Sequence, residues 1–388
     1  MQIVFSDAQY WNNFLPLTYT RPVAELRCGI LTFSERWKTL LEIENCSYIT
    51  EDYLQNKYPA PKKEEALFIV PNFLPTEGVL EQIKDLKFGE ALVYKDELLA
   101  ARINMDNFSL NQIEKMTDIH EDLFFFEKHT DLFSKNNAAI EFDFDLITKN
   151  RTSQPLSETN GFLGEKSNLF IEEGAVVEYS TLNCKTGKIY IGKNAEIMEG
   201  CHVRGSLALC EGSIINMGAK IYGATTIGPK SKVGGEVNNI VILGYSNKGH
   251  DGFLGNSILG EWCNLGADTN SSNLKNNYSE VKLWSYQSEK FEKTGLQFCG
   301  VIMGDHSKTA INIQLNTGTV VGVAANIFKS GFPPNVVEHF SWGGMKGDEK
   351  FTINKAFEVA EIAMSRRKVT LEENDKKILT YIFNNFVS

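Results

Sequence analysis

The sequence predicts an α/β domain, then a parallel β-helix, then a short helical segment. Three observations support this prediction. The chain has 388 residues, more than the roughly 100–200 of one compact domain, so at least two domains are expected. Strand-like and helix-like segments alternate over residues 1–150, whereas residues 161–331 carry an aliphatic residue at a regular six-residue step. Two amphipathic stretches then fall within residues 350–388.

The elements of the first domain follow from local apolar patterns. Short apolar runs at residues 1–6, 66–70 and 91–94 predict strands. Apolar residues at helical spacing in residues 29–42 and 77–86 predict helices between these strands. Strands that alternate with helices are typical of an α/β sheet.

The middle of the chain has a six-residue period. Eight aliphatic residues follow this step without a miss: Ile191, Ile197, Val203, Leu209, Ile215, Ile221, Ile227 and Val233. If aliphatic residues fill about a fifth of positions, such a run has a probability on the order of 10⁻⁶ per starting point. The phase is interrupted near Asn238 and resumes at Leu259. We therefore expect a three-sided prism whose aliphatic residues point inward, each coil resting on its neighbours. A β-sandwich with short strands is the alternative.

Composition excludes several classes of protein. Thirty-nine basic against 49 acidic residues give a net charge of −10, which argues against a general nucleic-acid or anionic-membrane binder. No apolar run reaches about 18 residues, and residues 1–14 lack the pattern of a signal peptide. The seven cysteines form no CxxC pair, so we expect reduced thiols in a cytoplasmic protein and no metal site.

The β-helical region resembles a known enzyme family. Residues 248–255 (KGHDGFLG), 259–267 (LGEWCNLGA) and 303–309 (MGDHSKT) are similar to coils of bifunctional sugar-1-phosphate nucleotidyltransferase/acetyltransferases, the archaeal-type branch in particular. The resemblance implies a left-handed parallel β-helix that assembles as a homotrimer. It also implies that this β-helix transfers acetyl from acetyl-CoA to an amino sugar.

The first domain resembles the nucleotidyltransferase domain of the same family. Residues 15–22 (LPLTYTRP) are similar to its PLTxxxPK element. However, residues 6–14 contain no glycine where the family has a Gly-rich loop around the triphosphate. No Asp lies near Asn72, where the family holds its divalent cation. Mg²⁺ is therefore expected only if this domain is active.

One histidine is the candidate catalytic base. His250 lies where the repeat phase breaks, between Gly249 and Gly252, and histidine titrates near neutrality, as a general base must. The resemblance implies the same role, whereas a histidine in a surface loop is the alternative. Asn264 and Asn273 are candidates to orient the histidine or to bind the substrate; turn formation is their alternative.

Six further residues are candidates for binding. Lys248, Lys282 and Asn277 are predicted to bind a sugar phosphate or nucleotide sugar, with solvated or turn positions as the alternative. Asp7, at the end of the first strand, and Arg21 and Arg27 are predicted to bind nucleotide, with structural ion pairs as the alternative for the arginines.

Three hypotheses about function follow. The first is an acetyl-CoA-dependent transferase that acts on an amino-sugar phosphate or nucleotide sugar, with His250 as base. The second is a sugar-1-phosphate nucleotidyltransferase in which the β-helix serves for assembly. The third is a non-catalytic protein that binds nucleotide sugars.

Overall fold

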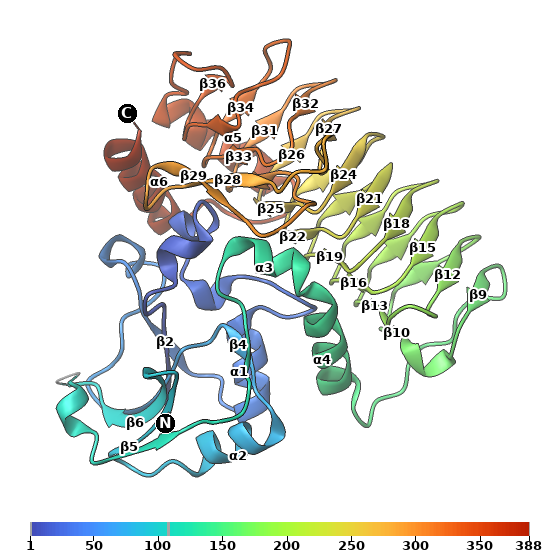
Figure 1. Ribbon diagram of the computed structural model, residues 1–388. Helices are drawn as coiled ribbons and strands as arrows, with labels where there is room; N and C mark the ends of the chain where they lie inside the picture. The colour runs from blue at the N-terminus through green and yellow to red at the C-terminus, as the bar shows by residue number, and fades with distance from the viewer. Residues whose placement is uncertain (1, 107–108, 388) are drawn as a thin grey trace.

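The computed structural model describes residues 2–106 and 109–387. Figure 1 shows an α/β domain, blue to green, beside a long column of stacked strands that runs from green to red. The predicted fold class is confirmed: an α/β domain with a mixed sheet, a left-handed parallel β-helix and terminal helices.

The α/β domain is built on one mixed sheet. In the described residues this sheet has six strands, in the order β2-β1-β3-β6-β5-β7. Their bounds are β1 Gln2–Ser6, β2 Cys46–Ile49, β3 Glu65–Ile69, β5 Glu90–Tyr94, β6 Glu97–Asn104 and β7 Lys115–Asp118; a separate small pair joins β4 Phe73–Leu74 to β8 Phe124–Phe125. Strand β1 is parallel to both neighbours, and all of its residues are buried, as in a sheet covered on both faces.

The α/β domain also contains four α-helices in the described residues, and the last of them, α4, packs against the column. Their bounds are α1 Phe33–Leu41, α2 Glu77–Asp85, α3 His129–Ser134 and α4 Asn136–Thr148. Helix α1 begins later than predicted because Thr32 caps it: Thr32 Oγ1 accepts from the Glu35 amide at 3.1 Å, and the Glu35 carboxylate accepts from the Thr32 amide at 2.7 Å. The residue that the prediction started from, Gly29, instead donates its amide to Asn136 Oδ1 at 2.8 Å, which ties α4 to this segment.

Three parallel sheets form the sides of the column. The first face contains β10 Leu169–Ile171, β13 Ile189–Ile191, β16 Leu207–Leu209, β19 Thr225–Ile227, β22 Val241–Gly244, β25 Ile258–Glu261, β30 Ile302–Met303, β33 Val320–Val321 and β35 Val336–Val337. The second face contains β11 Val176–Val177, β14 Glu196–Ile197, β17 Ile214–Ile215, β20 Lys232–Val233, β23 Asn247–Lys248, β26 Asn264–Leu265, β31 Lys308–Thr309, β34 Asn326–Ile327 and β36 Trp342–Gly343. The third face contains β9 Gly161–Leu163, β12 Thr181–Asn183, β15 His202–Arg204, β18 Lys220–Tyr222, β21 Glu236–Asn238, β24 Phe253–Gly255, β27 Asn270–Ser271 and β32 Gln314–Leu315.

The six-residue period sets the register of these sheets. Ile191 pairs with Leu209, and Leu209 pairs with Ile227, so aliphatic residues three steps apart stack directly on one another. These three side chains are completely buried. The predicted inward ladder is therefore the core of the column.

The residue type at one corner of the column changes from small or polar to aromatic along its length. Between the first and second faces, each coil turns through a residue with left-handed backbone, a conformation that suits asparagine and glycine. Early coils use Asn194 (φ 55°) and Gly212 (φ 60°) there. Later coils use Tyr245, Trp262 and His306, with φ of 54°, 61° and 60°. The rings of Tyr245 and Trp262 stack 4.3 Å apart, so an aromatic ridge replaces the usual small residues where the C-terminal helices pack.

The interruption of phase in the sequence is not an interruption of the column. Val233 pairs with Lys248 and Val237 with Leu254, so the coils continue through residues 238–250. Shorter corner turns shift the phase without breaking the ladder. A long insertion follows Ser271 and forms an antiparallel hairpin, β28 Lys282–Ser285 and β29 Lys290–Lys293.

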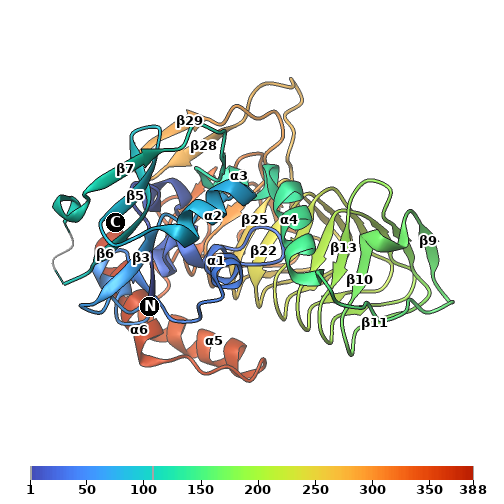
Figure 2. The same ribbon diagram turned by 90° about the horizontal axis from the view of Figure 1, so that it is seen from below.

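The α/β domain, the hairpin and the C-terminal helices pack together along the column. Val281 and Leu283 of the insertion belong to the same core cluster as strand β1. Helices α5 Ile353–Ser365 and α6 Glu373–Phe386 form a second cluster with Tyr19 of the α/β domain. Figure 2 shows α5 and α6 along one side of the assembly, away from the hairpin.

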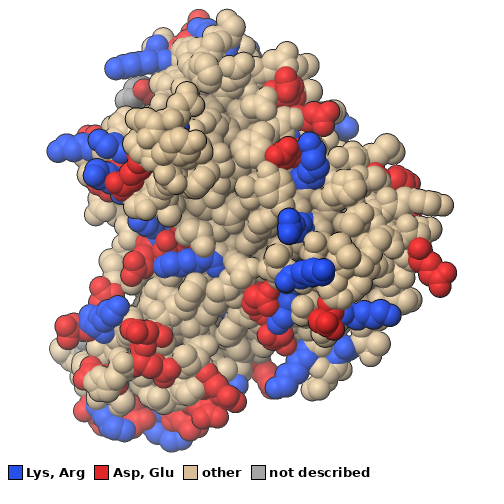
Figure 3. Space-filling model, turned by 45° about the vertical axis from the view of Figure 1, so that its right-hand side comes forward, with Lys and Arg blue, Asp and Glu red and all other residues tan. Residues whose placement is uncertain are grey.

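Within residues 2–106 and 109–387, no helix has both the length and the apolarity needed to cross a membrane. On the face drawn in Figure 3, Lys and Arg side chains are interspersed with Asp and Glu. The seven cysteines are unpaired, and six of them are buried.

Candidate functional site

His250 is exposed in the corner turn between β23 and β24. Two side chains hold the backbone of this turn. Lys248 Nζ donates to the His250 carbonyl at 2.6 Å, and Asn216 Nδ2 donates to the Gly249 carbonyl at 2.7 Å. Gly235 of the preceding coil (φ 71°) lies so close that a Cβ there would approach Asp251 Cα to 2.8 Å. The imidazole is thus presented to solvent from a fixed backbone.

Lys248 occupies an inward position in the ladder, where Val233 stands one coil earlier. It is 2 % exposed, and burial lowers its pKa to about 8, against the attraction of Asp251 and Asp268. Its ammonium is committed to the His250 carbonyl. The structure therefore gives Lys248 a positioning contact, and its predicted contact with substrate stays a prediction.

Asn264 lies near the same edge of the column as His250. It is exposed on β26, in the coil that follows the histidine. Its Oδ1 accepts from Asn247 Nδ2 at 3.4 Å, and Arg367 donates to Asn247 Oδ1 at 2.7 Å. Asn264 and His250 therefore lie in neighbouring coils of the column.

The other predicted residues of the β-helix lie at a different corner. His250 precedes β24, whereas Asn273 follows the neighbouring strand β27, so the two residues flank opposite ends of the third face. Asn273 Nδ2 donates to Asn256 Oδ1 at 2.7 Å, and Asn277 Oδ1 accepts from the Ser279 amide at 3.1 Å. The side-chain amides of Asn273 and Asn277 thus stabilise local turns.

Lys282 borders a surface cavity of about 690 Å³ at this second corner. Lys275 and Asn276 line the same cavity, together with Asn316 and Asn335. Two ammonium groups beside several amides suit an anionic, hydroxyl-rich ligand. The predicted role of Lys282 in binding a sugar phosphate stays a prediction, and this cavity is where it would act.

The two arginines predicted to bind nucleotide have partners within the chain. Arg21 is buried and pairs with Asp305 and, at 3.1 Å, with Glu261, both in the β-helix. Arg27 is buried and pairs with Glu35 at 3.1 Å. These contacts are the structural ion pairs that were the alternative reading, so nucleotide binding by either arginine stays a prediction.

Asp7 is buried at the carboxyl end of β1. Its Oδ1 accepts from the Val23 amide at 2.8 Å and its Oδ2 from Thr50 Oγ1 at 2.5 Å. Burial raises the pKa of Asp7 to about 7, although both hydrogen bonds oppose this shift. The carboxyl group thus holds the segment after β1.

The crevice at the carboxyl ends of β1 and β3 is nearly filled. Tyr10 stacks on Phe125 at 6.2 Å, and Phe125 stacks on Tyr94 at 5.4 Å. The space left between these rings and Glu97 is about 10 Å³, room for about one water molecule. Open α/β sheets bind their ligands outside the carboxyl ends of their strands, and the part of that region beside Tyr10 is closely packed.

The described residues contain no cluster of side chains suited to bind a metal ion. Among the residues that the structure describes, no group of three or more His, Cys, Asp or Glu side chains is arranged to hold a metal ion. Asn72, where the family resemblance puts a metal-binding Asp, is fully buried, and its Nδ2 donates to the Phe126 carbonyl at 2.7 Å.

Comparison with known proteins agrees with this architecture. Residues 2–152 match the family model described as sugar nucleotidyl transferase. A bifunctional sugar-1-phosphate nucleotidylyltransferase/acetyltransferase of Sulfurisphaera tokodaii is 31% identical over 144 residues, which are 37% of this chain and 35% of that protein. The chain is similar to that bifunctional protein over this stretch. The predicted resemblance is thereby confirmed.

Two archaeal proteins named bifunctional protein GlmU are also similar. The one from Methanocaldococcus jannaschii is 36% identical over 87 residues, 22% of this chain and 21% of that protein. The one from Methanococcus aeolicus is 30% identical over 87 residues, 22% of this chain and 20% of that protein. The matched stretches thus span about a third of the first relative and about a fifth of the other two.

Sequence reasoning missed two polar side chains that line a large, open cavity, His339 and Tyr286. Neither lies in the six-residue ladder, and neither has a motif around it. His306 is half-buried in the aromatic ridge, where its ring stacks beside Trp262.

Proposed function

We propose that the β-helix transfers an acetyl group from acetyl-CoA to an amino-sugar phosphate or nucleotide sugar. The observation that supports this proposal best is the presentation of His250: an exposed imidazole on a turn whose carbonyls are held by Lys248 and Asn216. The acetyltransferase activity named for the Sulfurisphaera relative supports the reaction class.

Acetyl transfer to an amine requires one general base, which we assign to His250. The amine nitrogen attacks the thioester carbonyl carbon, and the imidazole of His250 takes the proton that the amine loses. The C–S bond then breaks, and the imidazolium returns the proton to the leaving thiolate. We propose that the exposed amide of Asn264 donates a hydrogen bond to the substrate.

A second chain is part of the proposal. His250 stands on an outer corner, so the acetyl-CoA pocket needs a wall from outside this chain. We propose a homotrimer in which a neighbouring β-helix supplies that wall. The unpaired cysteines agree with a reducing compartment, and we propose the cytoplasm.

The test is acetyl transfer from acetyl-CoA to a panel of amino-sugar phosphates, followed by release of the CoA thiol. His250→Ala should lower kcat by about 10²–10⁴-fold, the usual contribution of a general base. His202→Ala is the matched control because His202 is also exposed on the third face, several coils away. Equal rates for His250→Ala and the wild type would reject this base.

Nucleotidyl transfer by the α/β domain is the second candidate, and the family match over residues 2–152 favours it. The close packing of rings beside Tyr10 and the glycine-free segment at residues 6–14 count against it. Mg²⁺-dependent release of pyrophosphate from UTP or dTTP with a sugar 1-phosphate would support this activity. Tight binding of a nucleotide sugar without turnover would instead support the third candidate, a binding protein.

A further inference from the structure

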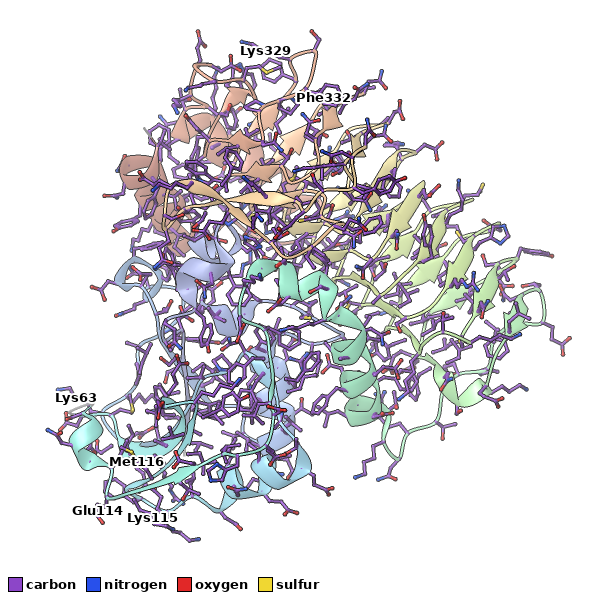
Figure 4. All side chains as sticks on the ribbon, viewed as in Figure 1. Lys63, Glu114, Lys115, Met116, Lys329 and Phe332 are labelled. Carbon is purple, nitrogen blue, oxygen red and sulfur yellow. The ribbon has the colours of Figure 1, made fainter. Side chains whose placement is uncertain are left out.

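A cavity of about 1040 Å³ lies where four parts of the chain meet. Its walls come from the segment after β1, the inserted hairpin, the last coil of the β-helix and the end of α6. Seven aromatic or imidazole rings line it: Trp11, Tyr19, Trp284, Tyr286, Phe291, His339 and Phe386. In Figure 4, Lys329 and Phe332 mark the tip of the loop that leads into this last coil, at the far end of the molecule from Lys63 and Met116.

His339, which lines this cavity, has one hydrogen-bond donor without a partner among the described residues. Its Nδ1 accepts from the Val323 amide at 2.9 Å, so Nδ1 carries no proton. Burial lowers the pKa of His339 to about 3, and the ring is therefore neutral at pH 7 with its proton on Nε2. Nε2 is buried and has no partner among the described residues. His339 is 3 % exposed, so a bound molecule is the natural partner for this N–H group.

Tyr286 places a second polar group beside the first. Its hydroxyl oxygen is also buried without a partner in the part of the chain that the structure describes. The rings of Tyr286 and His339 are 5.6 Å apart, and Tyr19 meets both edge-on, at 5.4 and 4.5 Å. The cavity thus combines flat apolar walls with a fixed N–H donor and a neighbouring hydroxyl that can accept or donate.

We propose that this cavity binds a nucleobase. A nucleobase has flat faces that stack on aromatic rings, and its edge carries an acceptor next to a donor. Those two atoms match the His339 N–H group and the Tyr286 hydroxyl. The cavity has the size of an ordinary ligand pocket, whose few polar groups orient a largely apolar ligand.

The charges at the rim of the cavity favour contact with the base of a nucleotide over contact with its phosphates. Lys350 at the rim is paired with Glu338, and Asp348 is paired with Lys329. Lys346 is the remaining cation among the lining residues that the structure describes, and Glu289 lies at the same rim. A single lysine among acidic groups does not build a phosphate site.

This site is separate from the edge that carries His250, and the inference does not depend on the proposed acetyl transfer. A nucleobase could come from a nucleotide sugar or from the adenine of the acyl donor. Uridine, thymidine and guanosine on one side and adenosine on the other distinguish these two sources.

The experiment measures binding of these nucleosides to the full chain by calorimetry, with ribose 5-phosphate as the probe that lacks a base. We expect at least one nucleoside to bind and ribose 5-phosphate not to bind. Tyr286→Phe keeps the ring and removes only the hydroxyl, so it should weaken nucleoside binding by about fivefold to tenfold, the effect of one hydrogen bond.

Tyr278→Phe is the matched control because Tyr278 is exposed on the same insertion and does not line the cavity. It should bind nucleosides as the wild type does. Thermal melting with and without nucleoside gives a second measurement: the ligand should raise Tm less in Tyr286→Phe than in Tyr278→Phe. The proposal is overturned if no nucleoside binds, if ribose 5-phosphate binds equally well, or if Tyr286→Phe matches the wild type.

Discussion

Arg21 joins the α/β domain to the β-helix, and its removal is the sharpest test of the domain junction. Its guanidinium pairs with Asp305 and with Glu261 at 3.1 Å, and it is 4 % exposed. Thr20 Oγ1 also donates to Asp305 Oδ2 at 2.8 Å. The substitution Arg21→Met keeps an unbranched apolar stem of similar shape and removes the charge.

The expected loss follows from burial. Without Arg21, the carboxylate of Asp305 stays buried with only neutral donors, the Thr20 hydroxyl and the Glu261 amide. Breaking a buried pair by removing one partner lowers the free energy of unfolding by about 3–5 kcal/mol. Arg102→Met is the control: Arg102 pairs with Glu65, and the two side chains are 33% and 43% exposed, so this loss should stay below about 1 kcal/mol.

Urea denaturation of both variants, followed by tryptophan fluorescence, measures these losses. A second arm measures binding of UTP to wild type and Arg21→Met. If Arg21 served nucleotide and not the junction, Arg21→Met would lose UTP binding and unfold at the same urea concentration as Arg102→Met. That result would refute the structural assignment.

Three further predictions concern buried charge. Burial raises the pKa of Asp7 from 3.8 to about 7, so the folded state favours the protonated acid and stability should fall as pH rises from about 4 to 7; Asp7→Asn should flatten this slope in urea titrations. Burial lowers the pKa of His306 to about 3, so the neutral ring stabilises the folded state above about pH 6.5. As the pH falls from 6.5 towards 3, the free energy of unfolding should decrease by up to about 1.4 kcal/mol per pH unit. His306→Gln should reduce that acid sensitivity, and an unchanged slope would contradict the assignment. Asp143→Asn should cost about 3–5 kcal/mol in the same assay because Arg36 Nε lies 2.7 Å from Asp143 Oδ1 and both side chains are 0% exposed; a loss below about 1 kcal/mol would contradict it.

The sequence predicts the column because the column repeats a local rule. Every inward position of a coil must be filled, so Ile191, Leu209 and Ile227 reveal the period on their own. The same rule fails where one coil puts Lys248 inward, since a lysine is expected outside unless its ammonium finds a partner such as the His250 carbonyl.

Contacts between distant segments leave no local pattern. Arg21 and Asp305 are 284 positions apart, and no sequence pattern around either residue indicates its partner. The nucleobase cavity is hidden for the same reason: Trp11, Tyr286 and His339 come from three separate segments that only the fold brings together. The corner turns are also hard to predict, because a shortened turn near Asn238 shifts the phase in the sequence while the strands stay paired.

The most direct test of the proposed acetyl transfer is a crystal structure of the protein with acetyl-CoA. We expect the thioester carbonyl carbon beside the imidazole of His250, in a crevice completed by a neighbouring β-helix. A thioester bound instead in the cavity beside His339, or an imidazole of His250 that faces open solvent in every chain of the assembly, would contradict the proposal.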